Sequence, residues 1–183
     1  MNAAQPDPPD SSAGLVPRKV RMGGTTKPEL MKQLRSAGVE LNAYAQALFD
    51  DSRFSPANAI TSVGVTALSV ADLGLPDGAR FAEILARAED LGLSPCPLEM
   101  GPHLRLQFLQ QVEASVGHPA TAQGAPAGSL TVASLPLDDS DETPKGFYLR
   151  RVDGRLWLRG YRSWPGHVWS PCDQLVFVSA APT

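Results

Sequence analysis

Apolar residues recur with helical spacing in the first half of the chain. Between residues 26 and 38, leucines repeat four positions apart, Thr26 and Glu29 have the spacing of a capping box, and Gly38 ends the pattern. A second apolar stripe over residues 41–49 follows the i, i+3, i+4, i+7 rule. The two stripes predict two helices that form a helical hairpin. Acidic residues beside the second helix argue against a DNA-reading helix-turn-helix.

A third helix has the clearest pattern in the chain. Asp77 is expected to cap it and Gly92 to end it. Its buried face is expected to consist of Phe81, Ile84, Leu85, Ala88 and Leu91. A fourth helix is expected between Pro102 and Gly117, because the length of this segment and its polar tail favour helix over strand. The β-branched run over residues 62–70 predicts a strand before the third helix.

After residue 129 the periodicity changes to the alternation of β-structure. Residues 129–137 read as one strand, residues 146–162 as a hairpin, and the run that starts at Gln174 as a last strand. Helices first and strands later predict an α+β fold, in which N-terminal helices pack with a C-terminal antiparallel β-meander.

The same patterns divide the chain into segments. Residues 1–25 are rich in Pro, Asp, Ser and Gly and are expected to form a disordered tail. Residues 26–116 should be mainly helical, residues 117–129 an Ala/Gly/Pro linker, and residues 130–180 an antiparallel sheet. We expect residues 26–180 to form one domain, since this length suffices for a single core.

The dipeptide Asp153-Gly154 fixes the geometry of the hairpin. Asp-Gly between two strand-like runs predicts a two-residue type I′ turn. Such a turn places Val152 opposite Arg155. The pairing then continues outward from the turn, with Arg151 opposite Leu156 and Arg150 opposite Trp157. Because side chains alternate between faces, one face should be the core face, with Phe147, Leu149, Leu156 and Leu158.

The opposite face of the hairpin combines arginines with aromatic rings. These candidate binding residues are Tyr148, Arg150, Arg155, Trp157, Arg159 and Tyr161. Guanidinium groups bind carboxylates or phosphates, and Arg, Trp and Tyr dominate protein-interface hot spots. Two interpretations stay open. Either this face is an exposed binding surface, or the helices or the acidic loop over residues 138–142 cover it.

Net charge bears on which partner such a surface would bind. The 183 residues include 16 Lys and Arg against 19 Asp and Glu, a formal net charge of −3. This balance gives no global attraction to nucleic acid or anionic lipid, so a protein partner with an acidic surface is expected before a nucleic acid. A short basic arm over residues 18–21 leaves nucleic acid as the second hypothesis.

Other features indicate a cytoplasmic protein without a membrane partner. No apolar run approaches the roughly 18 residues that span a bilayer, and the N-terminus lacks a secretory pattern. Cys96 and Cys172 form no CxxC pair, which argues against a structural zinc site and a disulfide framework. We expect no metal and no cofactor.

Catalytic constellations are sparse. Glu99 and His103 lie four residues apart, as an acid/base pair would on a helix, but Gly101-Pro102 stands between them. His167 and Cys172 could form a nucleophile pair near the last strand. The sequence contains no GxSxG, HExxH, Rossmann or Walker A pattern. No catalytic residue is therefore assigned, and a small hydrolase-like enzyme is the weakest alternative.

Three stretches together carry a family resemblance: "LGLSPCPLEMGPHLRLQFL", "PKGFYLRRVDGRLWLRGY" and "HVWSPCDQLVFV". They resemble a family of small bacterial proteins, mostly labelled uncharacterised and in some cases labelled helicase. The likeness covers about residues 28–179 and implies a bacterial cytoplasmic protein. It brings no catalytic residues with it.

The leading hypothesis from the sequence is therefore a non-enzymatic protein-binding module of bacterial regulatory, immunity or defence type. It would use the Arg/aromatic face of the hairpin. A nucleic-acid-binding accessory protein is the alternative.

Overall fold

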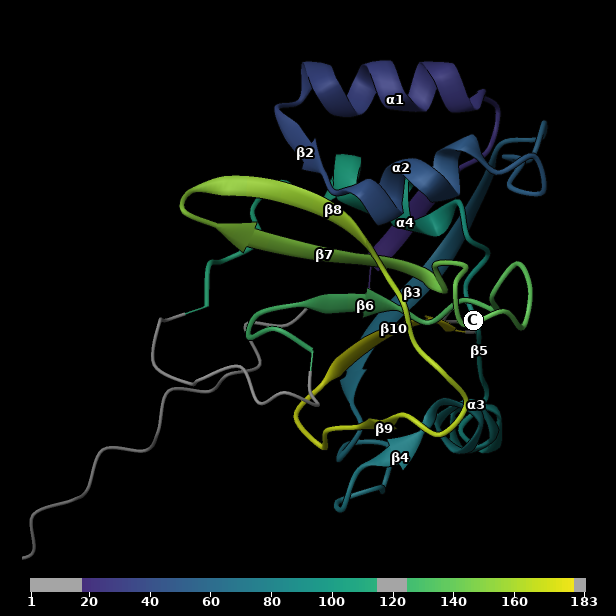
Figure 1. The fold of residues 1–183 in the computed structure, drawn as a ribbon, viewed down its shortest axis with the longest axis vertical. Coiled ribbons are helices and arrows are strands. Elements are labelled where there is room, and N and C mark those ends of the chain that lie inside the picture. The colour runs from purple at the N-terminus through teal and green to yellow at the C-terminus, as the bar shows by residue number, and fades with distance from the viewer. Residues whose placement is uncertain (1–17, 115–124, 180–183) are drawn as a thin grey trace, which may run out of the picture.

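A computed structural model describes residues 18–114 and 125–179 of the chain. Most strands form one curled sheet in the order β1-β3-β10-β6-β7-β8-β2, with β5 also paired to β10, while β4 and β9 form a separate ribbon (Figure 1). The strands are β1 Arg18–Met22, β2 Val39–Leu41, β3 Thr61–Ser69, β4 Ala79–Arg80, β5 Leu93–Ser94, β6 Leu130–Val132, β7 Gly146–Val152, β8 Arg155–Tyr161, β9 Val168–Trp169 and β10 Gln174–Ser179. The helices are α1 Lys27–Ser36, α2 Ala43–Asp50, α3 Phe81–Asp90 and α4 Met100–Gln107.

The predicted α+β class is confirmed, but the sheet is mixed where a purely antiparallel meander was expected. The meander extends only over β6, β7 and β8. After β8 the chain passes through β9 and returns as β10, which runs parallel to β6 and antiparallel to β3. At the other end of the sheet, β2 pairs parallel with β8. Long-range pairing therefore places strands of the first half of the chain on both sides of the block formed by those of the second half.

The N-terminal prediction of disorder to residue 25 is wrong from residue 18 onward. Residues 18–22 form β1, which pairs with β3 along its whole length and fully buries Val20. Residues 1–17 lie outside the described residues, as does the expected linker from residue 117 to residue 124. Residues 26–116 hold four helices but also β2 to β5, so this part of the chain contributes to the sheet as well.

Two helix predictions are corrected at their ends. Asp77 does not cap α3, because Ala79 and Arg80 are held extended by pairing with β9, and the helix starts only at Phe81. There the backbone N–H of Arg80 donates to the Glu83 carboxylate at 2.8 Å. The fourth helix spans Met100–Gln107 instead of reaching Gly117. Pro102 fits within its first turn, where no backbone N–H is required.

The expected helical hairpin of the first two helices is also modified. Val39–Leu41 does not form a simple helix–helix turn but leaves α1 to join the sheet beside β8. Thr26 accepts a hydrogen bond from the Glu29 backbone N–H at the start of α1, as half of the predicted capping box. Strand β2 therefore anchors both helices to the sheet.

The helices pack on the two faces of the sheet unequally. On one face α1, α2 and α4 bury a large cluster that includes Leu30, Leu48 and Leu104 against β7 and β8. On the other face α3 and the β4–β9 ribbon bury a smaller cluster with Leu175 and Phe177 of β10. In Figure 1, α1 and α2 lie at the top beside the β7–β8 hairpin, whereas α3, β4 and β9 lie at the opposite end. The smaller cluster leaves most of the hairpin outside it.

Amide side chains complete the hydrogen bonding at two edges of the sheet. The Gln107 amide accepts from the Arg21 N–H at 3.0 Å and donates to the Arg21 carbonyl at 2.7 Å. Asn42 does the same for Gly160 of β8, with distances of 2.8 Å and 3.0 Å. Asn42 also caps α2 by accepting from the Ala45 N–H. Each amide occupies the position of a residue on a further strand.

Candidate binding surface on the hairpin

The turn of the β7–β8 hairpin has the geometry that its sequence predicts. Asp153 and Gly154 have φ values of 50° and 72°, the positive values that a type I′ turn requires. The strands pair from Val152 opposite Arg155 outward to Gly146 opposite Tyr161. The predicted register is confirmed at every pair.

The division of the hairpin into two faces is also confirmed. Phe147, Leu149 and Leu158 are completely buried in the larger cluster, and Leu156 packs against its margin. The opposite side carries the six predicted residues, hereafter the ladder: Tyr148, Arg150, Arg155, Trp157, Arg159 and Tyr161. Arg155 is exposed and the other five are partly buried. No helix of the described chain lies over the ladder in the way that α3 lies over β10.

Arg159 organises the centre of the ladder. Its guanidinium carbon lies 5.0 Å from the centroid of the Trp157 ring and 6.0 Å from that of Tyr148. Cation–π contacts of this kind contribute about 0.5–1 kcal/mol at exposed sites. Burial raises the pKa of Tyr148, against the opposing effect of Arg159 and Arg150. The rings of Trp157 and Tyr148 thus position the Arg159 side chain but supply no negative charge to balance it.

The ladder carries more positive charge than its neighbours balance. Arg155 pairs with Glu40 of β2 at 3.6 Å, and both side chains are largely exposed. Neither Arg150 nor Arg159 makes an ion pair within the described residues. The Nε atoms of both are buried and have no hydrogen-bond partner among the described residues. An incoming group cannot reach these buried Nε atoms, but each guanidinium keeps a positive charge that no ion pair balances among these residues.

A carboxylate from outside the hairpin binds the backbone of its tip, beside Asp153 of the turn. Glu113 accepts from the backbone N–H groups of Asp153 and Gly154 at 2.6 Å and 3.0 Å. These hydrogen bonds, with smaller effects from nearby arginines, lower the pKa of Glu113. A partly open hollow of about 330 Å³ lies beside the tip, lined by Val152, Asp153, Arg155, Trp157 and Arg159. It gives the ladder a concave end.

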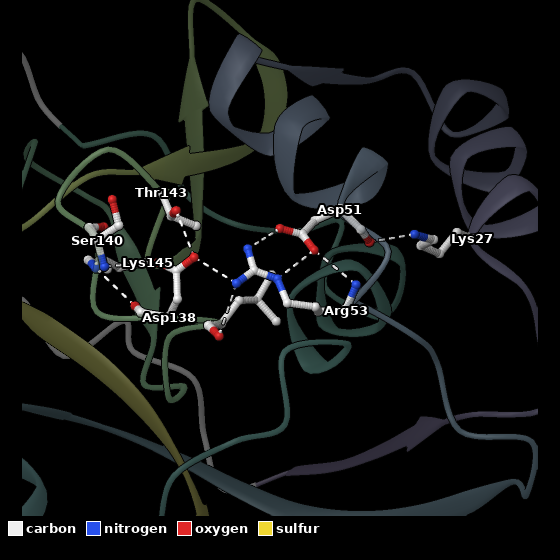
Figure 2. Close-up of polar contacts among 8 residues, drawn as sticks. Lys27, Asp51, Arg53, Asp138, Ser140, Thr143 and Lys145 are labelled. Atoms are coloured by element: carbon white, nitrogen blue, oxygen red, sulfur yellow. Dashed lines mark hydrogen bonds and ion pairs between the residues drawn. The ribbon is translucent and has the colours of Figure 1, made fainter.

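The acidic loop, Asp138–Glu142, is bound by cations that lie outside the ladder. Figure 2 shows Arg53 between Asp51 and Asp138, at 2.6 Å and 2.7 Å. Hydrogen bonds and charge from Arg53 lower the pKa of Asp51 to about 2 and also lower that of Asp138.

Two further cations hold the rest of this loop. Lys145 donates to the backbone carbonyls of Asp138 and Ser140 (Figure 2). Arg162 donates to the Asp141 carbonyl at 2.9 Å and pairs with Glu142 at 2.8 Å. No hydrogen bond or ion pair joins this loop to a ladder arginine within the described residues. The alternative that the acidic loop neutralises the ladder therefore finds no support in these contacts.

Aromatic contacts extend beyond the predicted residues. Tyr161 lies 6.4 Å from Tyr148 and 5.7 Å from Trp169, measured between ring centroids. His167 contacts Trp169 at 5.4 Å and Trp164 at 5.0 Å. Trp164 is 57% exposed. The predicted ladder ends at Tyr161, although the close spacing of aromatic residues over 161–169 is a sequence signal for this continuation.

Glu99 and His103 are brought together despite Gly101-Pro102, because α4 continues through both. Their carboxylate and imidazole lie 3.5 Å apart and are almost completely buried. The His103 Nε2 accepts from the backbone N–H of Gly23 at 3.1 Å, which requires a neutral ring. Burial lowers the pKa of His103, and Glu99 opposes this shift. This pair ties the end of β1 to α4, and neither of the described hollows is lined by it.

The second catalytic pair has no such geometry. Cys172 is exposed, and its backbone N–H donates a hydrogen bond to the Ser170 hydroxyl. His167 packs between two indole rings, and no contact joins it to Cys172 among the described residues. In the same residues, no group of three His, Cys, Asp or Glu side chains is placed to hold a metal ion.

Comparisons with protein-family models, with curated proteins and with solved structures found no match to this chain. The resemblance to small bacterial proteins therefore stays a prediction. Within residues 18–114 and 125–179, no helix is long and apolar enough to cross a membrane.

Proposed function

We propose that this chain is a non-enzymatic protein-binding module that engages an acidic surface of a partner protein through the ladder. The observation that carries the proposal is the open arginine–aromatic half of the sheet face. Its guanidinium groups lie on a hairpin whose opposite side is anchored by the completely buried Phe147, Leu149 and Leu158. Side chains fixed in this way lose little conformational entropy on binding.

The composition of the ladder fits protein recognition. Arginine, tryptophan and tyrosine are the residue types that most often carry binding energy at protein interfaces. Arg150 and Arg159 have no ion pair among the described residues, and guanidinium groups attract carboxylates strongly. The exposed pair between Arg155 and Glu40 is weak enough to exchange for a partner's carboxylate.

Nucleic acid is the second candidate, supported by the stacking rings beside the arginines. The basic arm gives it less help than the sequence indicated. Residues 18–21 lie in β1, and strands β3, β10, β6 and β7 stand between β1 and β8 in the order of the sheet. An oligonucleotide would have to cross this distance to contact both.

The test compares two double variants of the full chain in capture experiments from host lysate. Arg150→Ala with Trp157→Ala should keep the fold and lose a specifically captured protein. Arg35→Ala with Leu109→Ala removes one charge and one exposed apolar side chain elsewhere and should capture it like the wild type.

Circular dichroism and urea unfolding check that both variants are folded. If the Arg150→Ala, Trp157→Ala variant captures the same protein as the wild type, the ladder does not bind it. If only nucleic acid is captured, with an affinity that falls steeply as salt rises, the second candidate replaces the first.

A further inference from the structure

The ladder is one end of a longer surface, and its two ends differ in chemistry. From Trp157 through Arg159, Tyr148, Tyr161, Trp169 and His167 to Trp164, each successive pair is 5.0–6.4 Å apart. Trp169 is buried and supports the partly exposed His167 and the exposed Trp164. An extended segment of roughly ten residues, at about 3.3 Å per residue, is therefore long enough to reach from one end of the row to the other.

A hollow lies at each end of this row. The first, beside the hairpin tip, is lined by Arg155, Trp157 and Arg159 among others. The second has a volume of about 300 Å³ and is lined by Tyr44, Asp141, Arg162, Ser163 and Trp164. Both are open on one side, so each can admit a side chain of a bound segment.

The charges around the two hollows favour different kinds of bound side chain. At the first end two guanidinium groups, those of Arg155 and Arg159, line the hollow with one carboxylate, Asp153. Arg159 has no ion-pair partner among the described residues, so this end favours a carboxylate. At the second end Arg162 is already paired with Glu142 at 2.8 Å, and its pKa is raised chiefly by a hydrogen bond to Tyr44. An anion there would meet two carboxylates, Asp141 and Glu142, beside this one guanidinium. Tyr44 and Trp164 are 41% and 57% exposed. The second end favours an apolar or aromatic side chain.

We propose that the occupant of this surface is an extended segment of a partner protein that carries acidic residues at one end and a large apolar or aromatic residue at the other. This inference rests on the proposed function and specifies its partner. A continuous polyanion fits less well, because Asp141 and Glu142 beside the second hollow repel phosphates.

The three tryptophans supply the test. In the ¹⁵N-labelled full chain, the indole N–H signals of Trp157, Trp164 and Trp169 report on the first hollow, the second hollow and the buried support, respectively. The probes are peptides of about ten residues with glutamates at one end and phenylalanine at the other, made in both chain directions. Control peptides replace phenylalanine by alanine, or the glutamates by glutamine.

The two-ended peptide should shift the Trp157 and Trp164 signals together in one of the two chain directions, and bind several-fold more tightly than either control. Trp164→Ala should reduce its affinity to that of the alanine control peptide, whose own affinity should not change. If acidic peptides shift Trp157 but phenylalanine adds no affinity and leaves Trp164 unmoved, the two-ended inference is wrong and the proposed function stands. If no acidic peptide shifts Trp157 at millimolar concentration, both are wrong. A thymidine oligonucleotide that shifts both signals with higher affinity would also overturn the inference.

Discussion

One face of the sheet has two halves, one covered by a helix and one that carries the ladder. Over β10, α3 returns across the strands and buries Leu175 and Phe177 against Ile84. Over β7 and β8 no helix of residues 18–114 and 125–179 returns, and the same side of the sheet presents the ladder. Strand alternation is identical in both halves, so it does not decide which half becomes core. The apolar residues of β10 suit burial, whereas the arginines of the ladder suit contact with solvent. The path of α3 determines which half is covered.

The largest effect is expected from a cavity in the covered half. Phe177→Ala should lower the free energy of unfolding by about 3–5 kcal/mol, because the ring is completely buried. Trp157→Ala in the open half should lower it by less than about 1 kcal/mol. Urea unfolding of both variants measures the difference. Similar losses in the two variants would contradict the division of the face.

The open half should depend instead on support at its edge. Asn42→Ala removes the cap of α2 and two hydrogen bonds to Gly160, and should cost about 2–3 kcal/mol in unfolding free energy. Asn42→Asp keeps the acceptor but loses the donor to the Gly160 carbonyl, so its loss should be smaller. An alanine variant as stable as the wild type would show that β8 needs no such support.

A smaller, pH-dependent effect is expected where β1 borders the covered half. Burial holds the pKa of His103 below its ordinary value of 6.5, and the neutral ring accepts from Gly23. The unfolded state then binds more protons, so this contribution to stability is complete above pH about 6.5 and is lost as the pH falls below it. His103→Gln should unfold with a weaker pH dependence between about pH 7 and 5. An unchanged slope in urea unfolding would exclude this role.

The smallest effect concerns the ladder itself. A double-mutant cycle with Trp157→Ala and Arg159→Ala should give a coupling energy of about 0.5–1 kcal/mol in unfolding. The same two substitutions should have a larger effect on partner binding than on stability. Coupling well above this range would mean that the ladder is part of the structural core.

Local signals predicted the hairpin well. The Asp-Gly turn sets the register within two residues, and alternation then assigns each side chain to a face without any distant contact. Thr26 was likewise identified as a cap because its partner is only three residues away. These features needed no knowledge of the rest of the chain.

Features that depend on distant strands were missed. Asp77 has the character of a cap, yet pairing of Ala79 with Trp169 delays the helix start to Phe81. Residues 18–22 look polar and are ordered only because β3 offers them a partner. The openness of the ladder likewise follows from the position of α3, which no local pattern encodes.

The amide side chains at the sheet edges have a consequence for self-association. Gln107 and Asn42 occupy hydrogen-bonding positions of Arg21 and Gly160 that an incoming strand would need. An edge blocked in this way is a poor template for the strand-by-strand growth of fibrils. A strand that approached either position would have to displace an amide side chain before its own backbone could pair there.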